Sequence, residues 1–151
     1  MAKISFCMKN VYRAKWCAAH HMEPLAKLFM QINSVLFGCH ISYRAEIPKT
    51  TSISHHGHGV VINGACKFGE NVIIGHGVTI GNRMPLHPGH PVIGNNVYIG
   101  SGAYLGGGVS IGDNARIGAH AVVIKDVPKD CTAVGNPAKI IYQKKKNESI
   151  D

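Results

Sequence analysis

The chain has 151 residues, of which 16 are Lys or Arg and 8 are Asp or Glu, giving a formal net charge of +8. This length is enough for one domain with its own core and too short for two. Eighteen glycines beside only 7% aromatic residues exclude an ordinary helical bundle. No run of about 18 apolar residues is present, which excludes a membrane-spanning helix.

The five cysteines are widely spaced and include no CxxC pair. This usage is typical of reduced intracellular thiols rather than of a disulfide framework or a zinc site. The N-terminus does not have the pattern of a signal peptide, because Lys9, Arg13 and Lys15 interrupt it. We therefore predict a cytoplasmic location.

Residues 1–40 are predicted to form a short helical cap. Within it, residues 9–37 are expected to form two helices divided near Glu23 and Pro24, because proline is tolerated in the first turn of a helix. The second helix carries large apolar residues at helical spacing. We expect this stripe to pack against the open end of the domain that follows: Leu25, Leu28, Phe29, Ile32 and Leu36.

The positive charge is concentrated at the N-terminal end, where residues 1–49 carry 7 basic and 2 acidic side chains. Such an end predicts peripheral contact with an anionic membrane surface, the alternative being a solvated basic surface with no partner. A nucleic-acid partner is not expected, because no basic stretch interleaved with aromatic residues and no known binding motif is present.

A six-residue repeat occupies residues 41–128. Large apolar residues recur in steps of six at positions 62, 68, 74, 80, 93, 99, 105, 111, 117 and 123, and glycine follows eight of them. A second column of small apolar residues lies two positions earlier. This period fits neither a helix nor an alternating strand, but it does fit a short strand followed by a corner. Three such sides form a triangular coil of about 18 residues, so we predict an all-β parallel solenoid of four to five coils.

The repeat is interrupted between Ile80 and Ile93, where a step of thirteen positions replaces the regular step of six. The additional residues are predicted to bulge out as a loop within residues 81–92, and loops on a rigid scaffold often carry function. Residues 129–151 are predicted to form a C-terminal segment with turns near Pro128 and Pro137, ending in a polar, flexible tail.

With these repeats, the sequence resembles the hexapeptide-repeat acyltransferases, whose fold is a left-handed parallel β-helix. The resemblance covers about residues 37–142 and includes the closing segment VGNPAKII at residues 134–141. Within that superfamily the sequence is most similar to serine acetyltransferases and to their short, colanic-acid-type relatives that O-acetylate sugars. The resemblance implies acetyl transfer from acetyl-CoA to a hydroxyl, in a homotrimer with its active sites between subunits.

The resemblance assigns the catalytic histidines to His56 and His90. His56, in the run HHGHGVVI at residues 55–62, matches the first active-site histidine, and His90 before Pro91 matches the second. A neutral imidazole suits the removal of a proton from an attacking hydroxyl at neutral pH. His56 is accordingly the predicted general base, with His90 reaching it from a different chain.

The sequence departs from the serine acetyltransferases at two residues that hold the amino acid. An Asp precedes their first histidine and an Arg precedes their second, whereas His55 and Gly89 stand at these positions here. Their long helical N-terminal domain, which supplies a further acidic ligand, is replaced here by the short cap. These departures predict a neutral acceptor, a sugar or polysaccharide precursor, with free serine as the alternative.

Further histidines are candidate substrate-binding residues. His55 and His58 flank His56 and are its rivals as the base, His76 is expected to line the acceptor pocket, and His87 is the rival within the loop. No metal is expected, because the HxH spacing of these histidines is a weak indication of zinc. Cys66 lies in the column of small core residues, which favours packing over a role as an acyl-carrying nucleophile.

The predicted acetyl-CoA contacts follow the family by position. They are Gly81, Ser101 and Ala119 in a groove between two solenoids, with Lys125 and Lys139 near the phosphates. A different class of function, a non-catalytic solenoid that serves as a binding or assembly module, stays open, because such repeats also occur in proteins without transferase activity.

Overall fold

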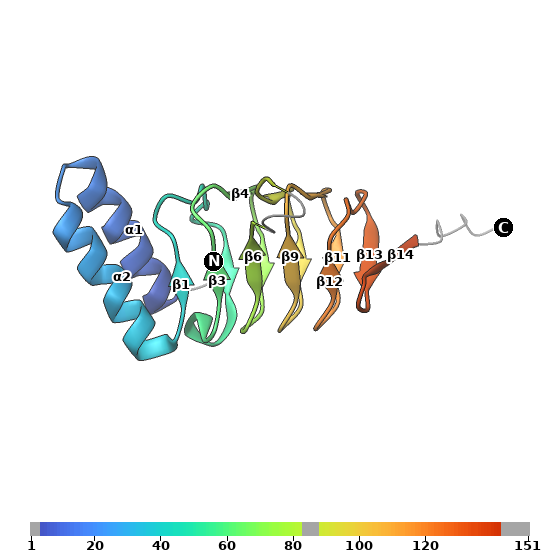
Figure 1. Cartoon of the computed structure of the whole chain (residues 1–151), viewed down its shortest axis with the longest axis horizontal. Helices are drawn as coiled ribbons and strands as arrows, with labels where there is room; N and C mark the ends of the chain where they lie inside the picture. The colour runs from blue at the N-terminus through green and yellow to red at the C-terminus, as the bar shows by residue number, and fades with distance from the viewer. Residues whose placement is uncertain (1–3, 83–87, 143–151) are drawn as a thin grey trace, which may run out of the picture.

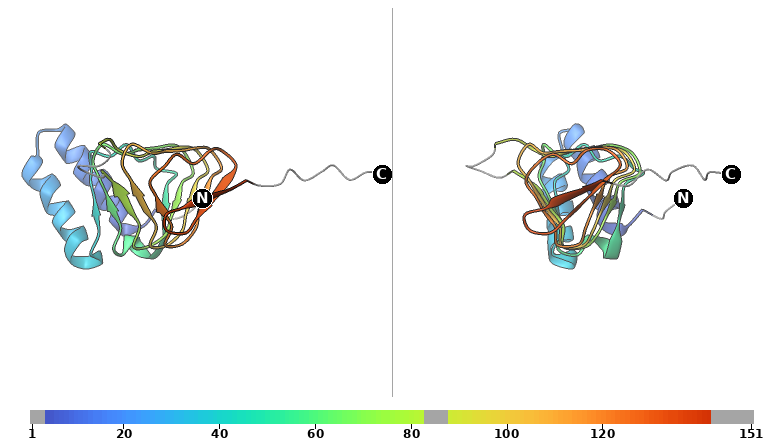
Figure 2. Two further views of the ribbon diagram at one scale, coloured as in Figure 1. Left: turned by 45° about the vertical axis from the view of Figure 1, so that its right-hand side comes forward. Right: turned by 90° about the vertical axis from the view of Figure 1, so that its right-hand side faces the viewer.

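The computed structural model describes residues 4–82 and 88–142, which form a helical hairpin followed by a parallel β-solenoid (Figure 1). The hairpin consists of α1 (Phe6–Ala19) and α2 (Glu23–Phe37). It covers the N-terminal end of the solenoid, and the coils stack away from it toward the C-terminus. The cross-section of the solenoid is triangular (Figure 2).

Each side of the triangle is a sheet of very short strands. The five-stranded face contains β1 (His40–Ile41), β3 (Val61–Ile62), β6 (Thr79–Gly81), β9 (Tyr104–Gly106) and β12 (Val122–Val123). The three-stranded face contains β4 (Lys67–Phe68), β7 (Val92–Ile93) and β10 (Ser110–Ile111). The six-stranded face contains β2 (Ser52–Ile53), β5 (Ile73–Ile74), β8 (Tyr98–Ile99), β11 (Arg116–Ile117), β13 (Cys131–Val134) and β14 (Lys139–Tyr142).

The strand register confirms the predicted solenoid. Ile99 pairs with Ile117, one regular coil later in the chain. Ile74 pairs with Ile99 over a longer interval, because the intervening coil contains the predicted seven-residue insertion. The ten large apolar residues of the repeat and the small column are all buried, so both columns form the core.

A second insertion was not predicted. Ile53 pairs with Ile74, so the coil between them is longer than a regular coil by three positions. These additional residues lie between β2 and β3, where the 3₁₀ turn η1 (Ser54–Gly57) carries His55 and His56. The step of nine positions from Ile53 to Ile62, in place of six, was the sequence signal for this insertion.

The helical cap is confirmed, but the predicted packing of its apolar stripe is wrong. Leu28 and Leu36 of α2 are 49% and 56% exposed. It is α1 that joins the solenoid core, through Cys7, Met8 and Val11, while α2 packs on α1. Helical periodicity predicts which face of a helix is apolar, but not which element will cover that face. Here α2 packs on α1 through a different face, where the small, buried Ala26 allows a close approach.

The C-terminal segment contains more structure than the predicted turns. β13 continues the six-stranded face, and β14 folds back on it as an antiparallel strand, pairing Ala133 with Ile140. This hairpin covers the last coil with two four-residue strands. The predicted polar tail at residues 143–151 lies outside the described residues.

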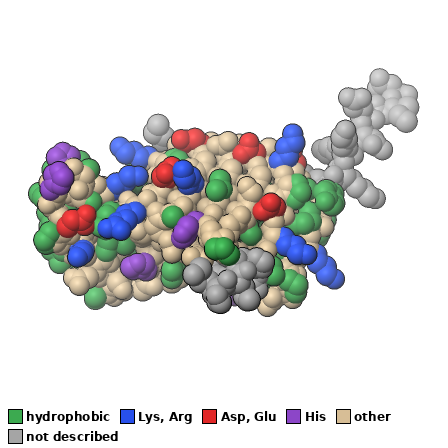
Figure 3. Space-filling model, turned by 45° about the horizontal axis from the view of Figure 1, so that its top comes forward, with side chains coloured by type: hydrophobic (Ala, Val, Ile, Leu, Met, Phe, Trp, Pro, Cys, Tyr) green, Lys and Arg blue, Asp and Glu red, His purple; other side chains and the backbone are tan. Residues whose placement is uncertain are grey.

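Among the described residues, no helix has the length and apolar character needed to cross a membrane. On the face shown in Figure 3, Lys and Arg side chains extend from the helical hairpin to the C-terminal strands and do not gather into one patch. The contact of the basic N-terminal end with an anionic membrane stays a prediction.

Candidate functional site

The two insertions lie at two different corners of the triangle. We call the corner between the six-stranded and five-stranded faces the histidine corner, formed by residues 54–60, 75–78, 100–103 and 118–121. We call the corner between the five-stranded and three-stranded faces the loop corner, formed in the described part of the chain by residues 63–66, 82, 88–91 and 107–109. The described part of the seven-residue insertion consists of Asn82 and residues 88–91.

The turn η1 has an unusual backbone. His55 and His56 have φ values of 49° and 55°, in the left-handed region that side chains other than glycine seldom adopt. Each costs about 1–2 kcal/mol relative to a right-handed conformation. The next residue, Gly57, has φ +81°, and a Cβ there would lie 3.0 Å from the Sγ of Cys7. The turn is therefore packed tightly on the start of α1, with both imidazoles on its exposed side.

The ring of Phe37, the last residue of α2, lies between two of these imidazoles. Its centroid is 5.6 Å from that of His56, with the rings nearly parallel at 21°. It is also 5.6 Å from His58, whose ring is almost perpendicular at 84°. No sequence pattern indicated this contact, because it depends on the direction in which the hairpin leaves the solenoid.

The next coils extend the histidine corner. The ring of His76 lies 5.2 Å from that of His55, edge to face. Its Nδ1 is 3.2 Å from the Oγ of Ser101, within hydrogen-bonding distance. Backbone bonds join the coils here, since the Gly77 N–H donates to the His58 carbonyl over 2.8 Å. The structure thus brings together four of the predicted histidines and Ser101, and it also places Ala119 on this corner.

His90 lies at the loop corner. It is half-buried, and its Nδ1 and the Oδ1 of Asn82 are buried without a hydrogen-bond partner among the described residues. The preceding Gly89 has φ +117°, and a Cβ there would lie 2.9 Å from the Cα of Gly108. An arginine therefore does not fit this backbone, which accounts for the glycine at this position. His87 lies outside the described residues.

The two predicted catalytic histidines do not meet within one chain. The five-stranded face lies between their corners, and roughly 13 Å of extended chain crosses it. The predicted acetyl-CoA residues are divided in the same way, with Ser101 and Ala119 at the histidine corner and Gly81 at the end of β6 on the loop side. Within one chain, the predicted site residues therefore fall into two separate groups.

A groove of about 360 Å³ lies beside the loop corner. Lys125 contributes the cation of this groove, and the exposed Gly108 leaves its backbone open to a ligand, because glycine has no side chain. The adjacent Asp126 accepts a hydrogen bond from the Ser110 N–H over 2.8 Å, which holds this segment in place. Lys139 lies elsewhere, at the start of β14. The lining comprises Pro88, Gly106, Gly108, Val109, Ile124, Lys125 and Asp126.

The structure also bears on two other kinds of site, a reactive cysteine and a metal site. Cys66 is fully buried, and burial raises the pKa of its thiol to about 11, which supports the packing role predicted for it. Within residues 4–82 and 88–142, no cluster of three or more His, Cys, Asp or Glu side chains is placed to hold a metal ion.

Comparison with known proteins gives the site a context. Residues 90–125 match the family model described as bacterial transferase hexapeptide (six repeats), which identifies the solenoid as a left-handed β-helix. The comparison with curated protein sequences gives no match.

Several solved serine acetyltransferases share the fold. The enzyme from Neisseria gonorrhoeae is 32% identical, with a TM-score of 0.84 over 93% of this chain and 54% of its own. The soybean enzyme complexed with serine is 35% identical, with a TM-score of 0.81 over 89% of this chain and 56% of its own. The Brucella abortus enzyme in complex with coenzyme A is 30% identical, with a TM-score of 0.83 over 90% of this chain and 54% of its own. The chain spans about half the length of these neighbours.

Proposed function

We propose that this chain is an acyltransferase of the hexapeptide-repeat superfamily that transfers an acetyl group from acetyl-CoA to the hydroxyl of an acceptor alcohol. The observation that carries the proposal is the exposed His56, held in a tight turn on a rigid corner whose next coils carry His76 and Ser101. A solved neighbour in complex with coenzyme A supports the choice of donor.

In the proposed reaction, the acceptor oxygen attacks the thioester carbonyl carbon. His56 takes the hydroxyl proton as the new C–O bond forms, and it returns this proton to the sulfur as the C–S bond breaks, which releases coenzyme A as the thiol and leaves His56 neutral again. Neutral imidazole accepts a proton readily near neutral pH, so a histidine is well matched to this step. His90 would orient the acceptor from the loop corner.

Serine is the acceptor that the comparisons favour, because the neighbours are serine acetyltransferases and one is complexed with serine. The predicted sugar acceptor is not confirmed. It stays a second candidate on one observation: the residues before the two histidines are His55 and Gly89, and the backbone at Gly89 has no room for an arginine that would bind a carboxylate.

We propose that the complete site forms between two copies of the chain in a homotrimer. The histidine corner of one copy would face the loop corner of the next, bringing His56 and His90 together across the interface. Closed cyclic symmetry would create three equivalent sites from one pair of surfaces. The 360 Å³ groove with Lys125 would then receive part of the acetyl-CoA, and the Lys125 cation would pair with phosphate.

An acceptor screen tests the proposal. Purified protein is incubated with acetyl-CoA and either L-serine or a panel of sugars, and the coenzyme A thiol that is released is measured. We expect release with serine, with a loss of about 100- to 10,000-fold in His56→Ala. His20→Ala is the matched control, because His20 is an exposed histidine on the helical hairpin, stacked on Trp16.

The other outcomes are equally informative. Release with a sugar and none with serine would reject the serine acceptor and support the second candidate. If no acceptor releases coenzyme A and acetyl-CoA does not raise the melting temperature, the non-catalytic solenoid becomes the better description.

A further inference from the structure

The end of α2 is joined directly to the histidine turn. Gly38 follows Phe37 in the left-handed conformation, with φ +58°, and its N–H donates to the Ser34 carbonyl over 3.0 Å, which ends the helix. The carbonyl of Phe37 accepts a hydrogen bond from the Gly59 N–H over 3.1 Å. The last residue of the helix is therefore held against the segment that carries His56 and His58.

The Phe37 ring contacts both of these imidazoles. It lies nearly parallel to His56 and edge-on to His58, with both centroids at 5.6 Å. The ring of Phe6 also lies 6.1 Å away at 60°, so Phe37 is itself supported by the first turn of α1. Three aromatic contacts thus fix the orientation of one side chain that no sequence motif had identified.

The His56 side chain has few other constraints. It is exposed and makes no side-chain hydrogen bond among the described residues, and the stacked Phe37 ring is an aromatic contact that limits its rotation. The face of an aromatic ring carries negative charge density, which favours a cation beside it. A base stacked in this way is held in one orientation and is also stabilised after it has accepted a proton.

We propose that Phe37 is a positioning residue that orients the His56 imidazole toward the acceptor hydroxyl. This inference rests on the proposed function of His56 as the base. It also gives the helical hairpin a role beyond covering the end of the solenoid, because the hairpin delivers the ring that holds the base. A misplacement of about 1 Å at a reacting group can lower a rate by about 100-fold.

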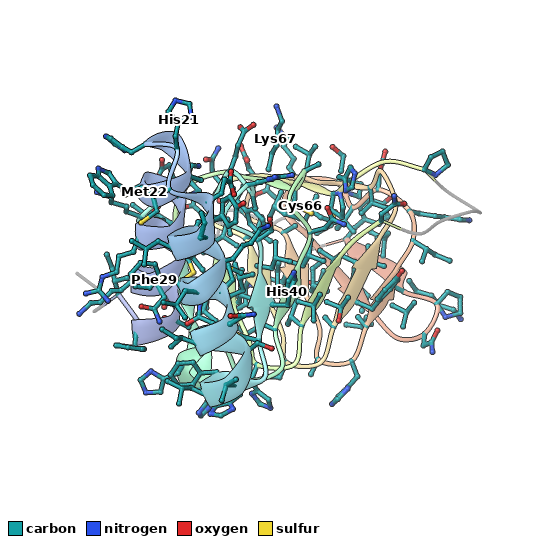
Figure 4. The ribbon with its side chains drawn as sticks, turned by 60° about the vertical axis from the view of Figure 1, so that its left-hand side comes forward. His21, Met22, Phe29, His40, Cys66 and Lys67 are labelled. Atoms are coloured by element: carbon teal, nitrogen blue, oxygen red, sulfur yellow. The ribbon has the colours of Figure 1, made fainter. Side chains whose placement is uncertain are left out.

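The test compares two phenylalanines of the same helix. Phe37→Leu removes the ring beside His56, whereas Phe29→Leu removes a ring that lies on the hairpin over Arg13, away from η1 (Figure 4). We expect Phe37→Leu to lower kcat about 10- to 100-fold with little change in the KM for acetyl-CoA. Phe29→Leu should leave kcat within about twofold, and Phe37→Tyr, which keeps the ring, should restore most of the rate.

A second readout does not depend on activity. The ring protons of His56, assigned with His56→Ala, experience the ring current of Phe37 in the NMR spectrum of histidine-labelled protein. We expect these signals to move in Phe37→Leu and to stay in place in Phe29→Leu and Phe37→Tyr. If no acceptor is ever turned over, the proposed function fails, but this spectrum still decides whether Phe37 holds the ring.

Two results would overturn the inference. The first is a Phe37→Leu spectrum in which the His56 signals are unchanged. The second is a loss of kcat that Phe37→Tyr fails to rescue or that Phe29→Leu reproduces, since either would show a general effect on the hairpin rather than on the imidazole.

Discussion

The two insertions in the repeat differ in how the chain holds them. Three features hold the three-residue insertion at the histidine corner in place. They are the left-handed backbone of His55 and His56, the packing of Gly57 on Cys7, and the stacking of the Phe37 ring on His56. At the loop corner, the described return of the seven-residue insertion is fixed by the close approach of Gly89 to Gly108, while polar atoms of Asn82 and His90 have no partner among the described residues.

This difference shows how a solenoid can gain a site without losing its register. Ile62 still pairs with Ile80 after the first insertion, and Ile93 still pairs with Ile111 after the second. Because the inward columns resume at once, residues can be added at a corner without disturbing the core. In the assembly proposed above, the histidine corner would be a preformed half-site, and the loop corner would be a half-site whose polar groups bond to a neighbouring chain or a ligand.

The largest expected effect comes from separating the two half-sites genetically. His56→Ala and His90→Ala should each lower the rate of acetyl transfer by about 100-fold or more. When the two variants are co-expressed at equal levels in a trimer with shared sites, about one quarter of the sites should contain both histidines. The specific activity of the mixture should therefore recover to about one quarter of that of the wild type.

This recovery separates a shared site from a site within one chain. If both histidines acted within one subunit, every subunit of the mixture would lack one of them, and the activity would stay at the level of the single variants. That result would reject the assembly proposed above. Mixed trimers carrying His20→Ala and His56→Ala are the control for the effect of co-expression.

Deleting each insertion tests the contrast in how they are held. Removing residues 82–88 or residues 55–57 restores a step of six in the inward column, so both variants should keep the solenoid. We expect the first deletion to change the free energy of unfolding by less than about 1 kcal/mol, because the entropy of loop closure depends only weakly on the length of the connecting segment. The second should lose about 1–3 kcal/mol, since it removes packing on Cys7.

Urea unfolding followed by circular dichroism gives both free energies. A loop deletion that destabilises the protein as much as the turn deletion would show that the seven-residue insertion is also held within the chain. Acetyl transfer should be lost in both deletions, so stability and activity are measured separately.

An effect of similar size on stability is expected from the two glycines that meet at the loop corner. Gly89→Ala places a Cβ 2.9 Å from the Cα of Gly108 in a residue with φ +117°, and should cost about 1–3 kcal/mol of unfolding free energy. Gly108→Ala is the matched control, because its Cβ would find the nearest atom, the Pro88 carbonyl oxygen, at 3.4 Å. Equal melting temperatures for the two variants would contradict the close backbone approach.

The sequence was sufficient to predict the repeat and its buried residues, but not how the helical hairpin packs against the solenoid. A period of six identifies every inward residue from Ile62 to Val123, because burial in a solenoid depends only on position within the coil. The seven-residue insertion follows from the same arithmetic, and the three-residue insertion was available from the spacing of Ile53 and Ile62. His56 and His90 came from the resemblance, and their roles stay predictions.

The packing of the hairpin could not be read in the same way. Leu28 and Leu36 form an apolar stripe that periodicity assigns to a buried face, yet they are exposed, and Phe37 reaches His56. Both outcomes depend on the angle at which two helices meet the first coil. That angle is decided by tertiary contacts such as the bond from Gly59 to Phe37, which leave no periodic trace in the sequence.

The smallest expected effect concerns the thiol of Cys66, which lies at the loop corner, one coil before the seven-residue insertion (Figure 4). Cys66→Ala should keep acetyl transfer within about twofold of the wild type, because the side chain fills the core and never carries the acetyl group.

Burial raises the pKa of this thiol to about 11, so it stays protonated and unreactive from pH 7 to about pH 10. Alkylation of folded protein, followed by mass spectrometry of the Cys66 peptide, should show little modification over that range, whereas labelling in urea should be complete. An acetylated Cys66 peptide trapped during turnover would instead place a covalent intermediate at the loop corner and reverse the assignment of that corner as an acceptor half-site.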